Sequence, residues 1–125
     1  MIVVVGAGLA GLQTVVALRA QGYDGRLTLL GAEPDPPYDR PPLTKALLLG
    51  ETDDSTLEAD WAALDVDLRL GVRVTAVQEH NLGTDAGELA FDRCVLATGA
   101  QPRRLPGAGT TVRTKADALA LRAAL

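Results

Sequence analysis

Three glycines near the start of the chain have the spacing of a phosphate-binding turn. Gly6, Gly8 and Gly11 form a G-x-G-x-x-G pattern directly after the apolar run 2–5. In such a turn the first glycine allows a sharp bend, the second leaves room for a pyrophosphate, and the third lets helix and strand pack closely. Amides at the helix start then face the phosphates, and the helix dipole favours their negative charge. The pattern predicts a dinucleotide site, with a ligand-free glycine turn as the alternative.

An acidic side chain follows this pattern at the spacing of a ribose contact. Glu33 lies roughly 20 residues beyond Gly11, after the second apolar run of the chain. A carboxylate at that position binds ribose hydroxyls and disfavours a 2′-phosphate, so both NAD and FAD fit it. The alternative is a solvated loop acid, because Ala32 occupies the position nearest the expected strand end.

This chemistry needs a strand, a turn, a helix and a second strand in that order. The run 2–5 (IVVV) predicts a strand buried on both faces, and 26–30 (RLTLL) predicts another. Between them, apolar residues recur at helical spacing from about Ala10, and Gly22 stands where a C-terminal glycine belongs. A βαβ unit of this kind gives parallel neighbouring strands.

The rest of the chain alternates loops with short elements. Five of the seven prolines fall in 32–45, so we expect a stiff loop there through which neither helix nor strand runs. The later patterns predict short helices over 45–49 and 57–64, strands over 66–70 and 72–78, a turn-rich segment over 79–88, a brief edge strand over 89–91, a buried strand over 93–98, a loop over 100–109 and a helix over 116–125.

Composition limits the function classes. A chain of 125 residues, 47% hydrophobic, suits one folded α/β domain rather than a disordered segment. The net charge of −4 argues against nucleic acid or an anionic membrane surface as partner. The N-terminal apolar stretch lacks a positive flank and is interrupted by glycines, so we expect neither a signal peptide nor a membrane anchor there. The single cysteine, Cys94, allows no disulfide framework, and we expect a cytoplasmic protein.

With PYDRPPLTK at 37–45 the sequence resembles the N-terminal FAD-binding portion of FAD-dependent ferredoxin reductases, within the pyridine nucleotide-disulfide oxidoreductase superfamily. The matching segments follow the family order across nearly the whole chain: VVVGAGLAGLQ, LRAQGYDGRLTLLG, YDRPPLTK, LGVRVTAV, FDRCVLATGAQPRRLPG and ADALALRAAL. The resemblance implies FAD as cofactor, NADH as electron donor and a ferredoxin- or rubredoxin-like acceptor. It also implies a Rossmann-like three-layer FAD-binding domain over 1–125, with a parallel sheet and a small antiparallel element.

The same resemblance assigns roles to individual residues. The pyrophosphate would be held by Gly6, Gly8, Gly11 and the backbone near Leu9 and Ala10. Glu33 would bind the adenosine ribose, although some relatives place the acid one position earlier, where this chain has Ala32. Further contacts would come from Arg40 at the pyrophosphate, Lys45 near flavin N5 or O4, the Val74 backbone at the adenine edge, and Thr98, Gly99 and Arg103 closing over the cofactor.

Elementary electrostatics is consistent with the two cationic roles. An acidic chain needs local cations to receive two phosphate charges, and arginine suits bidentate phosphate contact. A lysine ammonium beside the flavin ring would stabilise the negative charge that builds there, which makes Lys45 the candidate catalytic residue. The alternatives are ordinary solvated charges at Arg40, Lys45 and, with more weight, Arg103.

For three other residues with chemically versatile side chains, we favour a structural role over a role in chemistry. Cys94 lies in an apolar stretch and is expected in the core, His80 is expected as a solvated turn residue, and Trp61 as a helix anchor.

The resembled family continues beyond these segments with an NADH-binding unit and a C-terminal interface domain, which residues 1–125 do not contain. We therefore expect an FAD-binding segment that ends at a domain boundary, with a reduced antiparallel sheet over 79–90. We also expect weakened FAD affinity, self-association through exposed apolar surface, and no complete NADH-to-ferredoxin turnover by this chain alone. The alternatives are a non-catalytic FAD- or NAD-binding module and a dimerising remnant that binds nothing.

Overall fold

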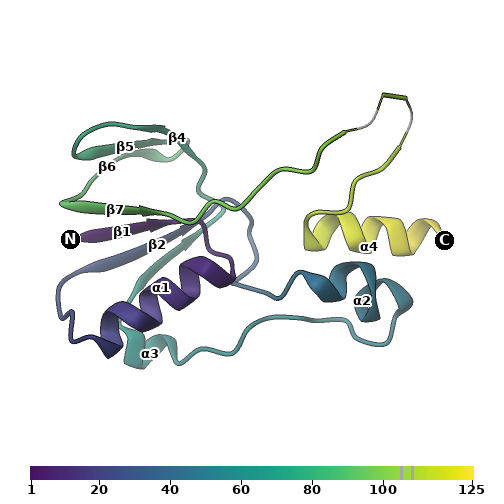
Figure 1. Cartoon of the computed structure of the whole chain (residues 1–125), viewed down its shortest axis with the longest axis horizontal. Helices are drawn as coiled ribbons and strands as arrows, with labels where there is room; N and C mark the ends of the chain where they lie inside the picture. Colours follow the sequence, from purple (N-terminus) through teal and green to yellow (C-terminus); the bar gives the residue numbers. More distant parts are fainter. Residues whose placement is uncertain (105, 108) are drawn as a thin grey trace. The chain divides into compact units, whose positions relative to one another are not determined.

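A computed structural model describes residues 1–104, 106–107 and 109–125, which form two compact units (Figure 1). The first unit comprises 1–37 and 57–99, and the second comprises 38–56 and 100–125. In the described part of the chain, no helix is long and apolar enough to cross a membrane.

A four-stranded parallel sheet in the order β3-β2-β1-β7 forms the centre of the first unit. Its strands are β1 (Ile2–Val5), β2 (Leu27–Gly31), β3 (Asp67–Leu70) and β7 (Arg93–Leu96). β1 lies between β2 and β7, with Val4 opposite Leu29 on one side and Val95 on the other. This central position explains why all four residues of β1 are apolar and buried, as the sequence predicted.

One face of this sheet is covered by helices. Successive residues of a strand point to opposite faces, and Ile2 and Val4 point to the face that carries α1 (Leu9–Ala20). There they pack with Val15 of α1, and Trp61 from α3 (Trp61–Leu64) joins the same cluster. The anchoring role predicted for Trp61 is confirmed.

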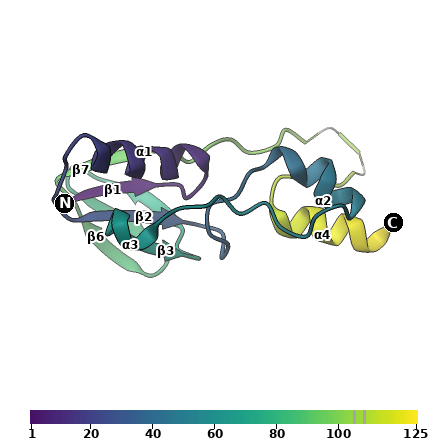
Figure 2. The same cartoon turned by 90° about the horizontal axis from the view of Figure 1, so that it is seen from below.

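The other face carries a three-stranded antiparallel sheet in the order β4-β5-β6 (Figures 1 and 2). Its strands are β4 (Val74–Val77), β5 (Asn81–Thr84) and β6 (Gly87–Ala90). Val3 and Val5 of β1 pack there with Leu82 and Phe91. Helices, parallel sheet and antiparallel sheet make three layers, which confirms the predicted fold class.

The hairpin of β5 and β6 corrects one expectation. Residues 79–88 were expected as a turn-rich segment and 89–91 as a brief edge strand, yet β5 and β6 pair over four residues each. Only Leu82 on β5 is buried, with Leu89 of β6 half-buried beside the same cluster, so the alternating apolar signal is confined to one residue per strand. Packing against the parallel sheet, rather than a local sequence pattern, therefore determines that these two segments form strands.

Two further boundaries differ from expectation. A short 3-10 helix, η1 (Pro41–Thr44), lies inside the proline-rich segment that was expected to hold no helix, because prolines are tolerated in a first helical turn. The helix expected over 57–64 begins only at Trp61. There the Asp60 carboxylate caps it by accepting a hydrogen bond of 3.0 Å from the Ala63 amide.

The end of α1 has both a predicted and an unpredicted feature. Gly22 has φ +85°, and the amides of Gly22 and Tyr23 bond back to the carbonyls of Arg19 and Leu18, which completes a glycine-ended helix as predicted. The Arg19 side chain, which the sequence did not single out, donates hydrogen bonds to four backbone carbonyls. They belong to Tyr23, Gly25, Leu64 and Asp65.

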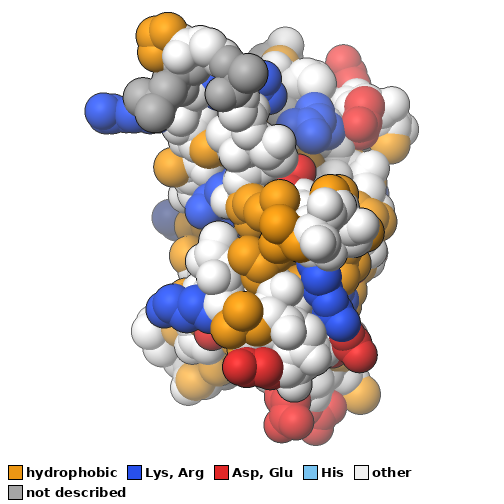
Figure 3. Space-filling view, turned by 90° about the vertical axis from the view of Figure 1, so that its right-hand side faces the viewer, with side chains coloured by type: hydrophobic (Ala, Val, Ile, Leu, Met, Phe, Trp, Pro, Cys, Tyr) orange, Lys and Arg blue, Asp and Glu red, His pale blue; other side chains and the backbone are white. Residues whose placement is uncertain are grey.

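The second unit contains η1, α2 (Ala46–Leu49) and α4 (Lys115–Ala124). A small cluster of buried residues joins them, consisting of Tyr38, Leu43, Leu47 and Ala118. α4 begins with a capping box in which Thr114 and Asp117 bond reciprocally to each other's backbone amides. Figure 3 shows hydrophobic side chains gathered on the face that α2 and α4 form. Leu49 of α2 is 73% exposed, and Leu125, directly after α4, is 91% exposed.

Candidate functional site

Two of the three turn glycines are required by close backbone packing. Gly6 has φ +113°, and a Cβ there would collide with the carbonyl oxygen of Ala97. A Cβ at Gly11 would collide with the carbonyl oxygen of Gly6. These two positions bring α1, β1 and the end of β7 together, as the sequence pattern predicted for the turn and the helix contact.

Gly8 differs from its neighbours because nothing fills the space in front of it. A Cβ at Gly8 would meet no protein atom within 4 Å, although its backbone is extended (φ −100°, ψ −166°) and needs no glycine. Gly8 caps α1 without a side-chain hydrogen bond, and the first intrahelical bond runs from the Leu12 amide to the Gly8 carbonyl at 3.0 Å. The amides of Leu9, Ala10 and Gly11 thus precede the first bonded turn. Open space before bare helix amides suits a phosphate group.

The carboxyl edge of the parallel sheet brings other predicted residues to this turn. The Ala97 amide bonds to the Val5 carbonyl at 2.7 Å, so Thr98 and Gly99 leave β7 beside Gly6. Both are exposed, and Gly99 has φ +70°. Ligands of open α/β sheets bind outside this edge, between strands whose connections diverge.

Glu33 lies at the same edge, two residues beyond β2. A Cβ at Gly31 would lie 2.7 Å from the Ala7 methyl group, which shows how closely the end of β2 approaches the glycine turn. Glu33 is half-buried, and its carbonyl accepts a hydrogen bond of 3.0 Å from the Gly71 amide. Its position fits the predicted ribose contact, which stays a prediction.

Val74 begins β4, the edge strand of the antiparallel sheet. Its side chain packs on the cluster around Val3 and Leu82, and a hydrogen bond of 2.9 Å from the Val72 amide to the Gly31 carbonyl holds the approach to β4 beside the end of β2. Because β4 is an edge strand, one side of its backbone is not paired within the sheet. That is compatible with the predicted backbone contact to adenine.

The three predicted cations lie in the second unit. Arg40 is half-buried and precedes η1, whereas Lys45 is exposed at the junction of η1 and α2. Arg103 is exposed in a segment without regular structure. The structure thus groups the glycine turn, Glu33, Thr98 and Gly99 at one sheet edge, and it places the cations in the other unit.

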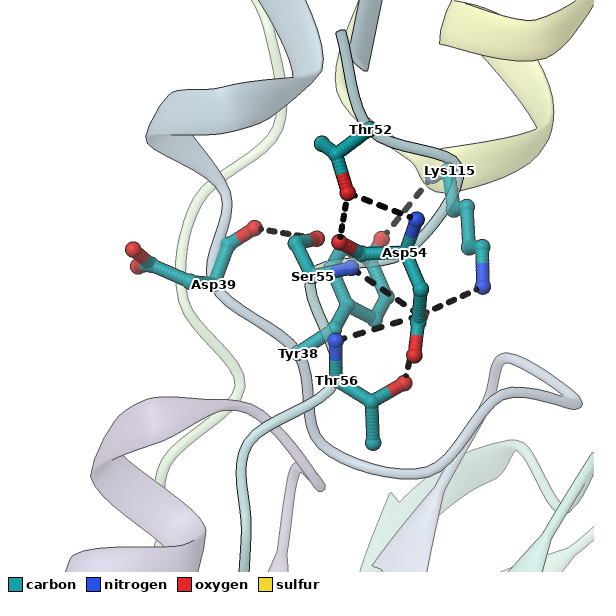
Figure 4. A network of polar contacts seen from close by, with 7 residues as sticks. All are labelled: Tyr38, Asp39, Thr52, Asp54, Ser55, Thr56 and Lys115. Atoms are coloured by element: carbon teal, nitrogen blue, oxygen red, sulfur yellow. Dashed lines mark hydrogen bonds and ion pairs between the residues drawn. The ribbon is translucent and has the colours of Figure 1, made fainter. Parts of the chain in front are cut away.

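The polar network around Tyr38 and Asp54 was not identified from the sequence (Figure 4). The Tyr38 hydroxyl accepts hydrogen bonds from Arg40 Nη1 at 2.8 Å and from the Lys115 amide at 3.0 Å. Asp54 Oδ1 lies 2.7 Å from the Thr56 hydroxyl and 3.0 Å from Lys115 Nζ. These hydrogen bonds, that of Thr56 first, lower the pKa of Asp54 to about 2. No local pattern marks Asp54 and Lys115, which are far apart in the chain.

The surroundings of Cys94 and His80 do not indicate a role in chemistry. Cys94 is half-buried against the cluster of Val3 and Leu82, and burial raises the pKa of its thiol, so it does not form a ready thiolate. It is therefore only partly in the core where it was expected. His80 is exposed, as predicted.

Comparisons with known proteins agree with the resemblance carried by YDRPPLTK and ATGAQPR. A family model described as pyridine nucleotide-disulphide oxidoreductase matches residues 1–125. The ferredoxin–NAD(+) reductase component of the biphenyl dioxygenase system of Paraburkholderia xenovorans (strain LB400) is 44% identical over 136 residues, which cover 99% of this chain and 33% of that protein. The chain spans about a third of the length of the curated relatives it matches.

Solved structures show the same partial match. A crystal structure of a protein called Fdr9 is similar with a TM-score of 0.91 and 55% identity, covering 98% of this chain and 32% of that one. Putidaredoxin reductase in its covalent complex with putidaredoxin is similar with a TM-score of 0.88 and 35% identity, covering 98% of this chain and 33% of that one.

Proposed function

The chain belongs to the pyridine nucleotide-disulphide oxidoreductase family, and on that premise we propose that it is the FAD-binding portion of an NADH-dependent ferredoxin reductase. Membership implies flavin and nicotinamide chemistry, and FAD is our specific proposal. The proposed electron acceptor is a small iron–sulfur protein of the ferredoxin type or, alternatively, a rubredoxin-like protein. The similarity to a ferredoxin–NAD(+) reductase component and to putidaredoxin reductase supports this choice.

The observation that carries the proposal is the open space before Gly8. Gly6 and Gly11 are blocked by backbone atoms, whereas the position between them faces no protein atom within 4 Å. A turn that needed glycine only for folding would have no reason to leave Gly8 uncovered beside bare amides of α1. A pyrophosphate fits both features, because it needs close backbone approach and N–H donors.

The residues of the chain have distinct proposed roles around that group. The amides of Leu9, Ala10 and Gly11 would bind the pyrophosphate, and the Glu33 carboxylate would bind the adenosine ribose. Val74 would contact adenine through its backbone. Thr98, Gly99 and Arg103 would close over the cofactor.

Two cations complete the proposed site. Arg40 would offset phosphate charge, and Lys45 would hold a positive charge at the flavin ring. When bound, FAD supplies the exchange between two-electron transfer from NADH and one-electron transfer to an iron–sulfur acceptor. Lys45 is exposed and no hydrogen bond or ion pair of its ammonium occurs in the described part of the chain, so it is available for such a role.

Titration of the purified chain with FAD tests the proposal. Binding is followed by quenching of flavin fluorescence, and Gly8→Val is compared with wild type. Valine at position 8 should lower FAD affinity by about tenfold or more, because its side chain fills the phosphate space. The melting temperature should change little, since the extended backbone accepts valine.

A matched control is Gly109→Val. A Cβ at Gly109 also meets nothing within 4 Å, and this glycine lies outside the turn, so its FAD affinity should equal that of wild type. Equal FAD affinity in Gly8→Val and wild type would refute the proposal. Stabilisation by NADH but not by FAD would favour a non-catalytic nucleotide module, and stabilisation by neither would favour a non-binding remnant.

Self-association and a cytoplasmic location belong to the same proposal. The exposed leucines on the face of α2 and α4, with Leu49 73% exposed, support association with another apolar surface. The unpaired thiol of Cys94 supports a reducing compartment.

A further inference from the structure

One end of the Arg40 side chain is held by three contacts within the second unit. Nη1 donates to the Tyr38 hydroxyl at 2.8 Å and to the Arg113 carbonyl at 2.7 Å. The guanidinium carbon also lies 4.9 Å from the centre of the Tyr38 ring. A half-buried arginine that is held in this way has lost most of its rotamer freedom on folding.

Tyr38 is itself rigidly placed. It is 4% exposed and packs with Leu43, Leu47 and Ala118. Its hydroxyl accepts a second hydrogen bond, of 3.0 Å, from the Lys115 amide at the first turn of α4, as Figure 4 shows. A backbone bridge to Thr56 fixes its main chain.

The contacts of Tyr38 and Arg40 connect two segments that are distant in sequence. Arg113 and Lys115 lie immediately before and at the start of α4, whereas Arg40 begins the turn that leads through η1 to Lys45. The hydroxyl of Tyr38 is the atom that both segments share. Removing it would leave the ring packing in place and release one side of the Arg40 guanidinium.

We propose that Tyr38 is a positioning residue, whose hydroxyl holds the Arg40 guanidinium in place for the pyrophosphate of a dinucleotide. This inference rests on the proposed function. An arginine that is already ordered loses little further freedom when it binds an anion, whereas an unrestrained one must be immobilised at that moment. Tyr38 thus acts on the ligand only through Arg40.

Tyr38→Phe tests this role, because phenylalanine keeps the ring and removes the hydroxyl. FAD affinity of the full chain should fall about three- to tenfold, the effect of freeing one long side chain. In an Arg40→Met background the same Tyr38→Phe change should have no further effect on FAD affinity. A purely structural role for Tyr38 would lower affinity equally in both backgrounds.

Arg122→Met is the matched control within the same unit. Arg122 Nη1 bonds to Asp53 at 2.8 Å and to the Leu47 carbonyl at 3.4 Å, and neither contact involves Tyr38 or Arg40. This variant should lower the melting temperature and leave FAD affinity unchanged. An equal loss of affinity in Arg122→Met and Tyr38→Phe would overturn the proposal.

Arg40→Lys provides a second test that does not depend on folding of the tyrosine variant. Lysine keeps the charge without the planar guanidinium, so FAD affinity should again fall at least threefold. Wild-type affinity in Arg40→Lys or Tyr38→Phe would overturn the positioning role alone. A wild-type chain that binds no FAD would overturn the proposed function, and the role of Tyr38 with it.

Discussion

The two compact units of the chain are stabilised by different interactions. In the first unit, the buried strands β1 and β2 pair in parallel with each other, β1 also pairs with the more exposed β7, and the sheet packs apolar side chains on both faces. In the second, a cluster of four buried residues within the described part of that unit is supplemented by side-chain hydrogen bonds and ion pairs. Among these are Tyr38 with Arg40, Asp54 with Lys115 and Asp53 with Arg122.

This difference indicates which kinds of change should destabilise each unit. Apolar packing and backbone pairing depend on shape and respond little to pH or salt. Exposed ion pairs and capping carboxylates depend on protonation and ionic strength. We therefore expect the first unit to lose stability when a new side chain obstructs its backbone contacts. The second unit should open locally more often when its charged groups are neutralised or removed.

The largest expected effect is that of Gly11→Ala on the first unit. The new Cβ collides with the carbonyl oxygen of Gly6, a backbone atom that cannot move without displacing β1. The free energy of unfolding should fall by about 3 kcal/mol or more. Urea unfolding measures this loss, and hydrogen exchange should locate it in residues 1–37 and 57–99.

Gly8→Ala is the control for this variant, because the space before it is open. Its stability should fall by about 1 kcal/mol or less, the cost of alanine at a helix cap. If Gly8→Ala and Gly11→Ala were equally stable, the contrast between a glycine packed against backbone and a glycine that faces open space would be wrong.

Arg19→Met should lower the unfolding free energy by an intermediate amount. It sharpens the comparison because Arg19 is a charged side chain that stabilises the mainly apolar first unit through hydrogen bonds. Its guanidinium donates to the carbonyls of Leu64 and Asp65 at the end of α3, at 2.7 and 2.8 Å, and to two carbonyls beyond α1. Loss of these charged hydrogen bonds should cost about 2 to 3 kcal/mol in unfolding free energy. Thermal unfolding of Arg26→Met, an exposed arginine of the same unit, should stay within about 0.5 kcal/mol of wild type.

The smallest expected effect is an acid-dependent loosening of the second unit. The pKa of Asp54 is about 2 in the folded chain, below the value near 4 of a free aspartate. Its ionised form therefore favours the folded state above pH about 4, and that contribution is lost as the pH falls towards 2. The protection of the amides in 52–56 against hydrogen exchange, taken relative to the intrinsic exchange rate at each pH, should fall over this range before protection in the parallel sheet does.

Asp54→Asn should accelerate exchange in the same segment at neutral pH and flatten its acid dependence. Thr56→Val, which removes the hydroxyl that contributes most to the lowered pKa, should shift the transition towards higher pH. An unchanged acid dependence in Asp54→Asn would show that another group controls this segment.

Local sequence was sufficient for the strands and the glycine turn of the first unit. The valines of β1 form a continuous apolar run, and only the buried Thr28 interrupts the leucines of β2; runs of this kind indicate buried parallel strands. The glycine turn and Gly22 marked the two ends of α1, because each needs a backbone geometry or a close approach that only glycine allows. The glycine turn could therefore be predicted from the spacing of neighbouring residues.

The strands β5 and β6 could not be predicted in this way. Each places one main side chain, Leu82 or Leu89, towards the core, and the remaining residues are small or polar. Two residues do not define an alternating pattern, so their pairing is decided by the exposed face of the larger sheet, which needs to be covered.

The sequence by itself determined the glycine turn, the helix it opens and the family of the chain, since all of these depend on residues that are close neighbours. Only the tertiary structure decided that Gly8 alone of the three turn glycines faces open space, and that Tyr38 and Arg113 hold Arg40. Tyr38 and Arg40 are two positions apart, but Arg113 reaches them only by the folded path of the chain. Contacts across such separations depend on where the elements pack, and no local preference of the residues encodes that.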